Sequence, residues 1–487
     1  MISKYFKNVG FLFFIEITLR FKNLLVLPIL TRHLGADGYG IWSQLMIFVA
    51  MLMPFSILGT DSAALRFFPT FDYVKRAKIF TAWTLMLMSV SLFIGIIAIL
   101  LSDFIAKHIF GNSLINFQLV IFASIFLCIN VLLTALRNWF RINEAPKMWG
   151  IAGLTHAFIN ICTVILSKNN NLDFLDTIKL ILLGDFFCCI FICAYINKLK
   201  GWAKPSFNFL PRLVRFGLPI VPTGFCIWGL DYFDRIILLK YESIALIGAY
   251  SVAYMLGSMV IQVLTSPVWG MYYPTAALLN EKNDFEKLDE LTRYSIYVIS
   301  FFCLPAICLL GLYGEELIYF IAGSDFLNAG KITWLIALGY FLAMLSSYCE
   351  ARLGLFYKQY HSSVAMIIAL IINVSINLLS IPFLGVLGAA ISTLFAFFCQ
   401  FLYAFYIANK INFFKINFII IFKLIISSAA MWTSIFFIKH YYYVTSFMEL
   451  LSIMFLGGVI YMAIIFSTNT ISPHIYIKII GNIKLKK

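Results

Sequence analysis

The chain has 487 residues, of which 62% are hydrophobic and only 12% are charged, and its mean hydropathy is +0.94. These values exclude a water-soluble globular protein. A net charge of +14 would suggest nucleic-acid binding in a soluble domain, but here the charge is scattered over short gaps between apolar segments, which argues against nucleic acid as a partner.

Fourteen apolar segments follow one another along the chain, each about long enough to cross a bilayer. A helix needs roughly 20 apolar residues to span a hydrocarbon core of about 30 Å, and only a helix satisfies its own backbone in lipid. The sequence therefore predicts an all-α integral membrane protein with fourteen transmembrane helices. The predicted spans are 9–31, 40–60, 78–101, 115–136, 148–167, 178–197, 213–239, 245–268, 293–313, 332–350, 360–380, 385–408, 416–438 and 446–466.

Basic residues mark one side of the membrane. With both termini cytoplasmic, 26 of the 36 Lys and Arg residues fall into the cytoplasmic gaps. This asymmetry is what the positive-inside rule predicts, so we expect a multi-pass protein with both termini in the cytoplasm.

Ionisable residues in the first two spans are candidate functional residues, because a charge in hydrocarbon is costly unless it faces a partner or water. Glu16 and Arg20 are four residues apart and share one helix face, whereas Lys22 points elsewhere. Asp61 and Arg66 are expected at the inner end of the second span.

The seventh span repeats this arrangement of charges. Asp231 and Arg235 are four residues apart, and Asp234 lies one turn from Asp231. Each pair, Glu16 with Arg20 and Asp231 with Arg235, is either an internal ion pair or part of a transport site, and the two interpretations are compatible. Arginine offers a planar fork for phosphate oxygens, while carboxylates could carry protons or bind a sodium ion.

The run EKNDFEKLDELTR (281–293) interrupts the basic pattern of the inner gaps. Its apolar residues Phe285, Leu288 and Leu291 are spaced three apart. This pattern predicts a short amphipathic helix that lies on the membrane between two halves of the protein.

The chain also contains a weak internal repeat. The stretches 34–44 and 246–256 each open an even-numbered span, and each is followed by an aromatic pair with proline, at 67–69 and 272–274. Six spans separate the copies, so both halves enter the membrane from the same side, as parallel repeats do. We expect an N-terminal six-helix lobe (1–200), a C-terminal six-helix lobe (201–410) and an accessory pair of helices with a tail (411–487).

The most specific motif is NVSINLLSIPFLGVLGAAIST (373–393), in which a helix with two asparagines ends in Ile-Pro and a glycine turn precedes Gly-Ala-Ala. It resembles a recurrent pattern of the Wzx polysaccharide flippases, members of the multidrug/oligosaccharidyl-lipid/polysaccharide (MOP) exporter superfamily. The stretches around 34–44 and 231–254 look like the same family. The motif residues are Asn373, Asn377, Pro382, Gly385 and Gly388, and helix turning and packing would equally explain them.

The resemblance implies a MATE-like, V-shaped pair of bundles that moves undecaprenyl-pyrophosphate-linked oligosaccharide units, such as O-antigen for lipopolysaccharide, to the outer leaflet by alternating access. It also implies a bacterial cytoplasmic (inner) membrane location. From depth and charge, we assign substrate contacts to Arg20, Lys22, Arg66 and Arg235. The coupling or charge-balancing carboxylates would be Glu16, Asp61, Asp231 and Asp234.

Other functions stay open at this point. A cation-coupled multidrug or small-solute antiporter is the first alternative, and a membrane enzyme of polysaccharide assembly is the second, although no large outer loop offers a catalytic domain. We expect no catalytic residue, no metal, no nucleic acid and no cofactor beyond coupling to H⁺ or Na⁺, because phosphate loops and zinc-type cysteine pairs are absent from the sequence. Expected partners are the lipid-linked oligosaccharide, membrane lipid and other polysaccharide-assembly proteins, with the chain itself a monomer.

Overall fold

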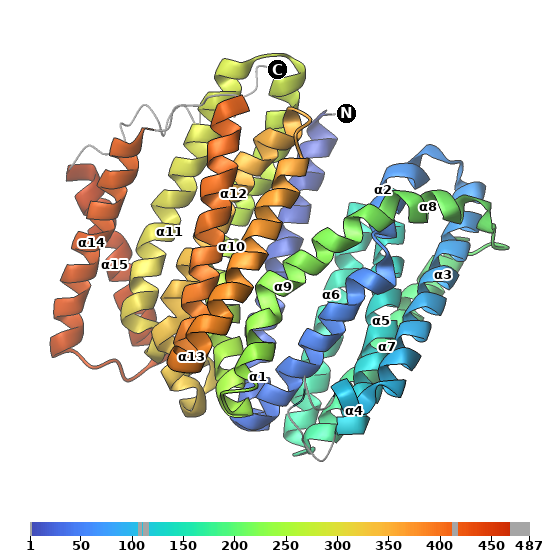
Figure 1. Ribbon diagram of the computed structural model, residues 1–487, viewed down its shortest axis with the longest axis horizontal. Coiled ribbons are helices and arrows are strands. Elements are labelled where there is room, and N and C mark those ends of the chain that lie inside the picture. Colours follow the sequence, from blue (N-terminus) through green and yellow to red (C-terminus); the bar gives the residue numbers. More distant parts are fainter. Residues whose placement is uncertain (1, 106–109, 111–115, 412–416, 468–487) are drawn as a thin grey trace. The chain divides into compact units, whose positions relative to one another are not determined.

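The computed structural model describes residues 2–105, 110, 116–411 and 417–467, and it describes their side chains except those of residues 2–24, 116 and 146. Over this part of the chain the fold is helical, without a strand (Figure 1). The α-helices are α1 (Ile2–Ile57), α2 (Thr60–Phe67), α3 (Tyr73–Leu100), α4 (Ser102–Ile105), α5 (Asn116–Ile142), α6 (Pro146–Asn169), α7 (Phe174–Lys198), α8 (Leu210–Gly217), α9 (Val221–Leu238), α10 (Ile244–Glu281), α11 (Phe285–Ala322), α12 (Thr333–Leu355), α13 (Tyr360–Ile411), α14 (Phe418–Tyr441) and α15 (Phe447–Ser467). Short 3-10 turns are η1 (Phe68–Thr70), η3 (Phe207–Phe209), η4 (Leu218–Ile220) and η5 (Ser324–Ile332).

The predicted spans coincide with these helices. Among the described residues, twelve helical stretches are long and apolar enough to cross a membrane. Two of the helices are double: α1 has 56 residues and α13 has 52, and each contains a glycine with non-helical backbone, Gly35 (φ 68°) and Gly385 (φ 54°). Gly35 falls between two predicted spans and Gly385 is the first residue of the predicted span 385–408, so the all-α membrane fold expected from the apolar segments is confirmed.

The second span ends three residues before its predicted end at residue 60. Helix α1 ends at Ile57, and Leu58 and Gly59 then take left-handed backbone angles (φ 56° and 61°). Asp61 and Arg66 therefore lie on a separate short helix, α2, rather than at the end of a membrane span. The break follows an apolar run, and the residues directly after it, Thr60, Asp61 and Ser62, are polar.

The amphipathic helix expected at 281–293 does not form a separate element. Glu281 ends α10 and Phe285 begins α11, whose first turn is capped by the Asp284 carboxylate accepting a hydrogen bond from the backbone N–H of Lys287 (3.3 Å). Leu288 is buried in the core formed with α10 and α12. The apolar spacing of this run is therefore the beginning of a long membrane helix.

Contacts divide the chain into two units. Unit 1 comprises Met1–Ser251 and Leu370–Ala389, and unit 2 comprises Val252–Ala369 and Ala390–Lys487. Helices α8 and α9 thus belong with α1–α7, although the sequence assigns them to the second lobe. The two six-helix lobes were inferred from the sequence repeat. The division by contacts does not test that repeat, so the lobes stay a prediction.

Within unit 1, gaps that were predicted on the same side of the membrane contact each other. The Arg76 guanidinium donates to the Asn143 side chain (2.8 Å), which joins the gap after the second span to the gap after the fourth. On the other side, Ser167 and His33 are hydrogen-bonded (3.0 Å) and join the gaps after the first and fifth spans. Figure 1 shows the short helices α2 and α8 together at one end of unit 1 and α4 at the other.

Aromatic residues form the core of unit 1 near the end that carries α2. Phe80, Trp83 and Trp139 are all buried, and the Phe80 and Trp139 ring centroids are 4.6 Å apart. The Trp83 indole N–H donates to the Thr60 hydroxyl (2.8 Å), so this core also holds α2 against α3.

Unit 2 contains two apolar cores. The larger one joins α10, α11, α12 and the second half of α13. The second joins α14 and α15 to α11 alone, through buried residues that include Tyr313, Leu424, Met431 and Leu450. An ion pair between Lys439 and Glu316 (2.6 Å) adds a polar link between α14 and α11.

Candidate functional site

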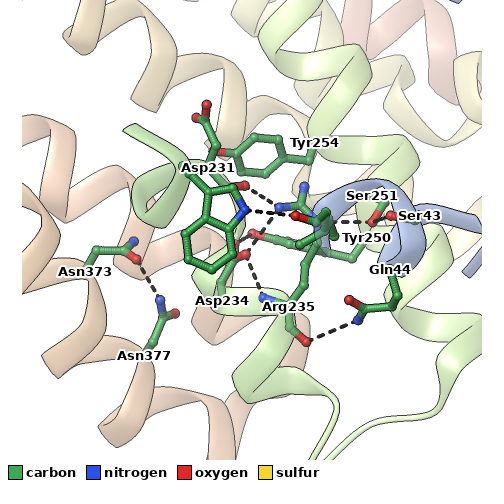
Figure 2. A network of polar contacts seen from close by, with 12 residues as sticks. Ser43, Gln44, Asp231, Asp234, Arg235, Tyr250, Ser251, Tyr254, Asn373 and Asn377 are labelled. Atoms are coloured by element: carbon green, nitrogen blue, oxygen red, sulfur yellow. Dashed lines mark hydrogen bonds and ion pairs between the residues drawn. The ribbon is translucent and has the colours of Figure 1, made fainter. Parts of the chain in front are cut away.

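Arg235 on α9 is the centre of a buried polar network in unit 1 (Figure 2). Only 2% of Arg235 and 1% of Asp234 is exposed. The guanidinium forms an ion pair with the Asp234 carboxylate (3.3 Å), donates from Nε to the Ser251 hydroxyl (3.1 Å) and donates from Nη1 to the backbone carbonyl of Asp231. Asp234 also accepts hydrogen bonds from the Tyr250 hydroxyl and from the backbone N–H of Arg235 (2.7 Å).

The network links α9 to α1 and to the first turns of α10. Ser43 donates to Ser251 (2.7 Å), and the Gln44 amide donates to the backbone carbonyl of Arg235 (3.4 Å). The two stretches 34–44 and 246–256, which the sequence analysis identifies as repeat counterparts, meet at this point. Their glycines allow the approach, since a Cβ on Gly248 would lie 2.9 Å from the Cα of Gly40.

The charge of Arg235 is therefore balanced by neighbouring groups within the network. A buried arginine is tolerated when a carboxylate balances its charge and further acceptors engage its N–H groups, and here Asp234, Ser251 and a main-chain carbonyl do so. The sequence pointed to Asp231 as the partner in an ion pair, whereas the ion pair of Arg235 is with the adjacent Asp234. A direct contact of Arg235 with substrate stays a prediction, as do the coupling roles of Asp231 and Asp234.

The charges of the first span cannot be placed in this network. The side chains of Glu16, Arg20 and Lys22 lie outside the described residues. Asp61 is half-buried in the first turn of α2.

Arg66 occupies a different environment from Arg235. It is exposed in the last turn of α2, and its guanidinium lies over the rings of Phe216 (5.0 Å to the centroid) and Phe67 (5.6 Å). No described carboxylate pairs with it. Of the predicted basic contacts whose side chains are described, Arg66 alone has its charge open to solvent or ligand.

The motif on α13 forms a helical hairpin in unit 1. Asn373 and Asn377 are fully buried, and the Asn377 amide donates to the Asn373 side-chain oxygen (2.9 Å), as Figure 2 shows. Helix continues through Pro382 and breaks at Gly385, so the turn comes three residues later than the Ile-Pro pair suggests. Gly388 then returns against Ser380, whose hydroxyl donates to the Gly388 carbonyl (3.2 Å).

A second buried carboxylate in unit 1 escaped the sequence analysis. Asp185 on α7 is 5% exposed, and one of its oxygens is hydrogen-bonded to His156 (2.9 Å) and to the Asn160 amide (2.6 Å), both on α6. The sequence does contain the feature that could have identified it, since Asp185 is an acidic residue inside the predicted span 178–197. Intramembrane carboxylates of this kind are functional candidates.

Unit 2 holds two further polar groups near the C-terminal end of α12. Arg352 is 1% exposed and donates to Asp289 (2.5 Å) and Thr292 (3.1 Å) on α11. Glu350 accepts hydrogen bonds from Ser346 (2.8 Å) and Gln400 (2.9 Å). Both groups join helices of the same unit.

Metal binding finds no support in the part of the chain that the structure describes. No three His, Cys, Asp or Glu side chains gather there as metal ligands. The ten cysteines are all free thiols within that part of the chain.

Comparison with known proteins gives both a family and a fold. The family model described as polysaccharide biosynthesis protein matches residues 29–331. The uncharacterized membrane protein MJ1068 of Methanocaldococcus jannaschii is 20% identical over 401 residues, which cover 76% of this chain and 77% of that protein.

Solved structures share the fold at low sequence identity. The lipid II flippase MurJ, in an inward closed conformation, superposes with a TM-score of 0.74 at 15% identity over 92% of this chain and 98% of its own. An inward-facing MATE family multidrug transporter of the MOP superfamily gives 0.67 at 16% identity over 81% and 98%. The likeness establishes the arrangement of helices.

Proposed function

Because the chain belongs to the polysaccharide biosynthesis protein family, we propose that it is a flippase for an oligosaccharide carried on a polyprenyl pyrophosphate lipid. The family match over residues 29–331 is the observation that carries the proposal. It confirms, with the fold shared with transporters of the MOP superfamily, the resemblance seen in the motif at 373–393. A transporter rather than an enzyme is the function that follows.

The proposed cargo is an undecaprenyl-pyrophosphate-linked repeat unit of a surface polysaccharide such as O-antigen. The chain would carry it from the cytoplasmic to the outer leaflet by alternating access of the two predicted lobes. The exposed charge of Arg66 supports an anionic group on the cargo, since a guanidinium binds phosphate oxygens through paired hydrogen bonds.

The proposed setting is a bacterial cytoplasmic membrane with both termini in the cytoplasm. The excess of basic residues in the cytoplasmic gaps supports this orientation. Arg76–Asn143 and His33–Ser167 each join segments predicted on one side of the membrane, which supports the predicted alternation of the gaps between the two sides. Coupling to H⁺ or Na⁺ through Asp231, Asp234, Asp61 or Glu16, a monomeric state and contacts with other polysaccharide-assembly proteins complete the proposal.

Deletion of the gene tests the function. Surface polysaccharide should disappear, and lipid-linked repeat units should accumulate on the inner leaflet, where a membrane-impermeant glycan probe cannot reach them in intact cells. Expression of the wild-type chain should restore both. Normal surface polysaccharide in the deletion strain, together with increased sensitivity to cationic drugs, would instead establish the multidrug antiporter.

A further inference from the structure

Helices α2 and α8 lie together at one end of unit 1 (Figure 1), and a cluster of phenylalanines with two arginines forms where they meet. We call it the Phe–Arg platform, and its residues are Arg66, Phe67, Phe71, Phe209, Arg212 and Phe216. The rings pack edge to face: Phe67 lies 5.9 Å from Phe209 and 5.4 Å from Phe216, and Phe71 lies 5.0 Å from Phe209. Such contacts fix the rings relative to one another.

The two guanidinium groups are held by these rings. Arg66 lies over Phe216 and Phe67 at 5.0 and 5.6 Å, and Arg212 lies over Phe67 and Phe209 at 5.1 and 5.5 Å. Both guanidiniums thus lie over the ring of Phe67, so the two charges are within about 11 Å of each other.

Neither charge is compensated by the protein. Both arginines are exposed, and within the residues that the structure describes neither takes part in an ion pair or donates a hydrogen bond to a side chain or a carbonyl. Ring faces orient a guanidinium without engaging its in-plane N–H groups. The platform therefore presents two arginine forks that no described side chain or carbonyl engages.

A hollow adjoins the platform at Phe209. It is lined by Lys75 and Lys78 together with Asp72, whose carboxylate is already engaged as the cap of α3 by accepting from the Lys75 backbone N–H (3.2 Å). Lys75 also lies over Phe71 (4.6 Å). The positive charge therefore continues from the arginines into a concave surface.

We propose that the Phe–Arg platform binds the pyrophosphate of a lipid-linked substrate at the membrane surface. Two linked phosphates offer acceptor oxygens to both forks, and each fork is able to form paired hydrogen bonds. The flanking phenylalanine rings suit the first isoprenoid units of the lipid. The inference rests on the proposed flippase function and on the orientation that places α2 and α8 at the cytoplasmic side, and it adds Arg212 and the rings to the predicted contact Arg66.

Binding to the full chain in nanodiscs of phosphatidylcholine tests the platform, with farnesyl pyrophosphate as the probe. The paired variant Arg66→Gln/Arg212→Gln should bind the probe about tenfold more weakly or worse, since charge-assisted hydrogen bonds are lost. The paired Lys variant should recover part of the affinity, because it keeps the charge and loses the fork. Phe67→Leu should also weaken binding, because both guanidiniums lose their shared ring.

Two matched variants control for loss of positive charge alone. Lys240→Gln removes an exposed cation over Tyr241 (5.5 Å) beyond the opposite end of α9, and Arg293→Gln removes an arginine over Tyr294 (5.7 Å) in unit 2. Both should bind the probe like wild type. Farnesyl monophosphate should bind more weakly than the pyrophosphate, and phosphatidylglycerol in the nanodisc should not compete.

Several results would overturn the platform proposal. They are unchanged binding in the paired Gln variant, an equal loss in the two controls, or competition by phosphatidylglycerol, which would make this a surface for bulk anionic lipid. The outcome is separable from that of the flippase proposal. Suppose that probe binding depends on Arg66 and Arg212 but deletion of the gene leaves surface polysaccharide intact. This result would contradict only the assignment of the cargo. If deletion removes the polysaccharide and the paired Gln variant restores it fully, only the platform proposal is contradicted.

Discussion

Arg235 and Arg66 both sit against aromatic rings in unit 1, yet their surroundings differ in every other respect. The Arg235 guanidinium lies 5.1 Å from the Tyr250 ring and Arg66 lies 5.0 Å from Phe216. Arg235 is buried and engaged by a carboxylate, a hydroxyl and a carbonyl, whereas Arg66 is exposed and engaged by rings alone. Aromatic contact is therefore common to the two arginines. Burial and the ion pair with a carboxylate separate Arg235 from Arg66.

The first prediction concerns the buried ion pair between Arg235 and Asp234. Asp234→Asn and Arg235→Gln should each lower the free energy of unfolding by about 3–5 kcal/mol, because each leaves an uncompensated buried charge. The double variant should lose much less than the sum. Thermal unfolding of the four proteins in detergent forms the double-mutant cycle. Additive losses would mean that the two side chains do not act as a pair.

The second prediction concerns the carboxylate that has no cationic lysine or arginine beside it. Asp185→Leu should cost about 1.5–3 kcal/mol, because the half-buried side chains of His156 and Asn160 lose the carboxylate to which they are hydrogen-bonded. Asp185→Asn should cost less, since it retains a side-chain oxygen as acceptor. Unfolding midpoints under identical detergent conditions measure the difference. Equal costs for the two variants would show that volume, and not hydrogen bonding, matters at this position.

The third prediction tests whether the platform is held in place by the backbone. A Cβ at position 217 would lie 2.3 Å from the Leu58 carbonyl oxygen, so Gly217→Ala should force α8 away from α2 at a cost of about 1–3 kcal/mol. Probe binding at the platform should fall as well, although no arginine is changed. Gly270→Ala is the control, because nothing lies within 4 Å of the added methyl group. An unchanged thermal unfolding midpoint for Gly217→Ala would show that the backbone near Leu58 moves to accept the methyl group without loss of stability.

The smallest effect is expected for the stability of the platform arginines themselves. Arg66→Gln and Arg212→Gln should each change the free energy of unfolding by no more than about 0.5–1 kcal/mol, since both side chains are exposed and contact only rings. The same thermal unfolding measurement checks this. A loss as large as that of Arg235→Gln would erase the distinction between the two arginines and make Arg66 a structural residue.

Much of the fold was predictable because hydrocarbon imposes one solution on an apolar segment. The runs of apolar residues located the membrane helices, and Gly35 and Gly385 fell where the chain had to turn. Asp61 and Arg66 were recognisable as charged residues close to the end of a predicted membrane span. These features depend on local composition alone.

What could not be predicted depends on contacts between distant segments. The separation of α2 from α1 follows from packing of Trp83 on Thr60 and from the approach of Gly59 to Gly217, both remote in sequence. Helical spacing suggested Asp231 as the partner of Arg235, whereas the guanidinium turns to the adjacent Asp234. The run 281–293 was ambiguous because an amphipathic surface helix and the first turns of a long helix share one periodicity.

The attachment of α14 and α15 has an evolutionary consequence. Their apolar core is shared with α11 only, and the Lys439–Glu316 pair reaches the same helix. Substitutions on one face of α11 would therefore suffice to strengthen or weaken the attachment of both helices. Natural selection could then modify the end of this chain while leaving untouched the helices that carry Arg235 and the Phe–Arg platform.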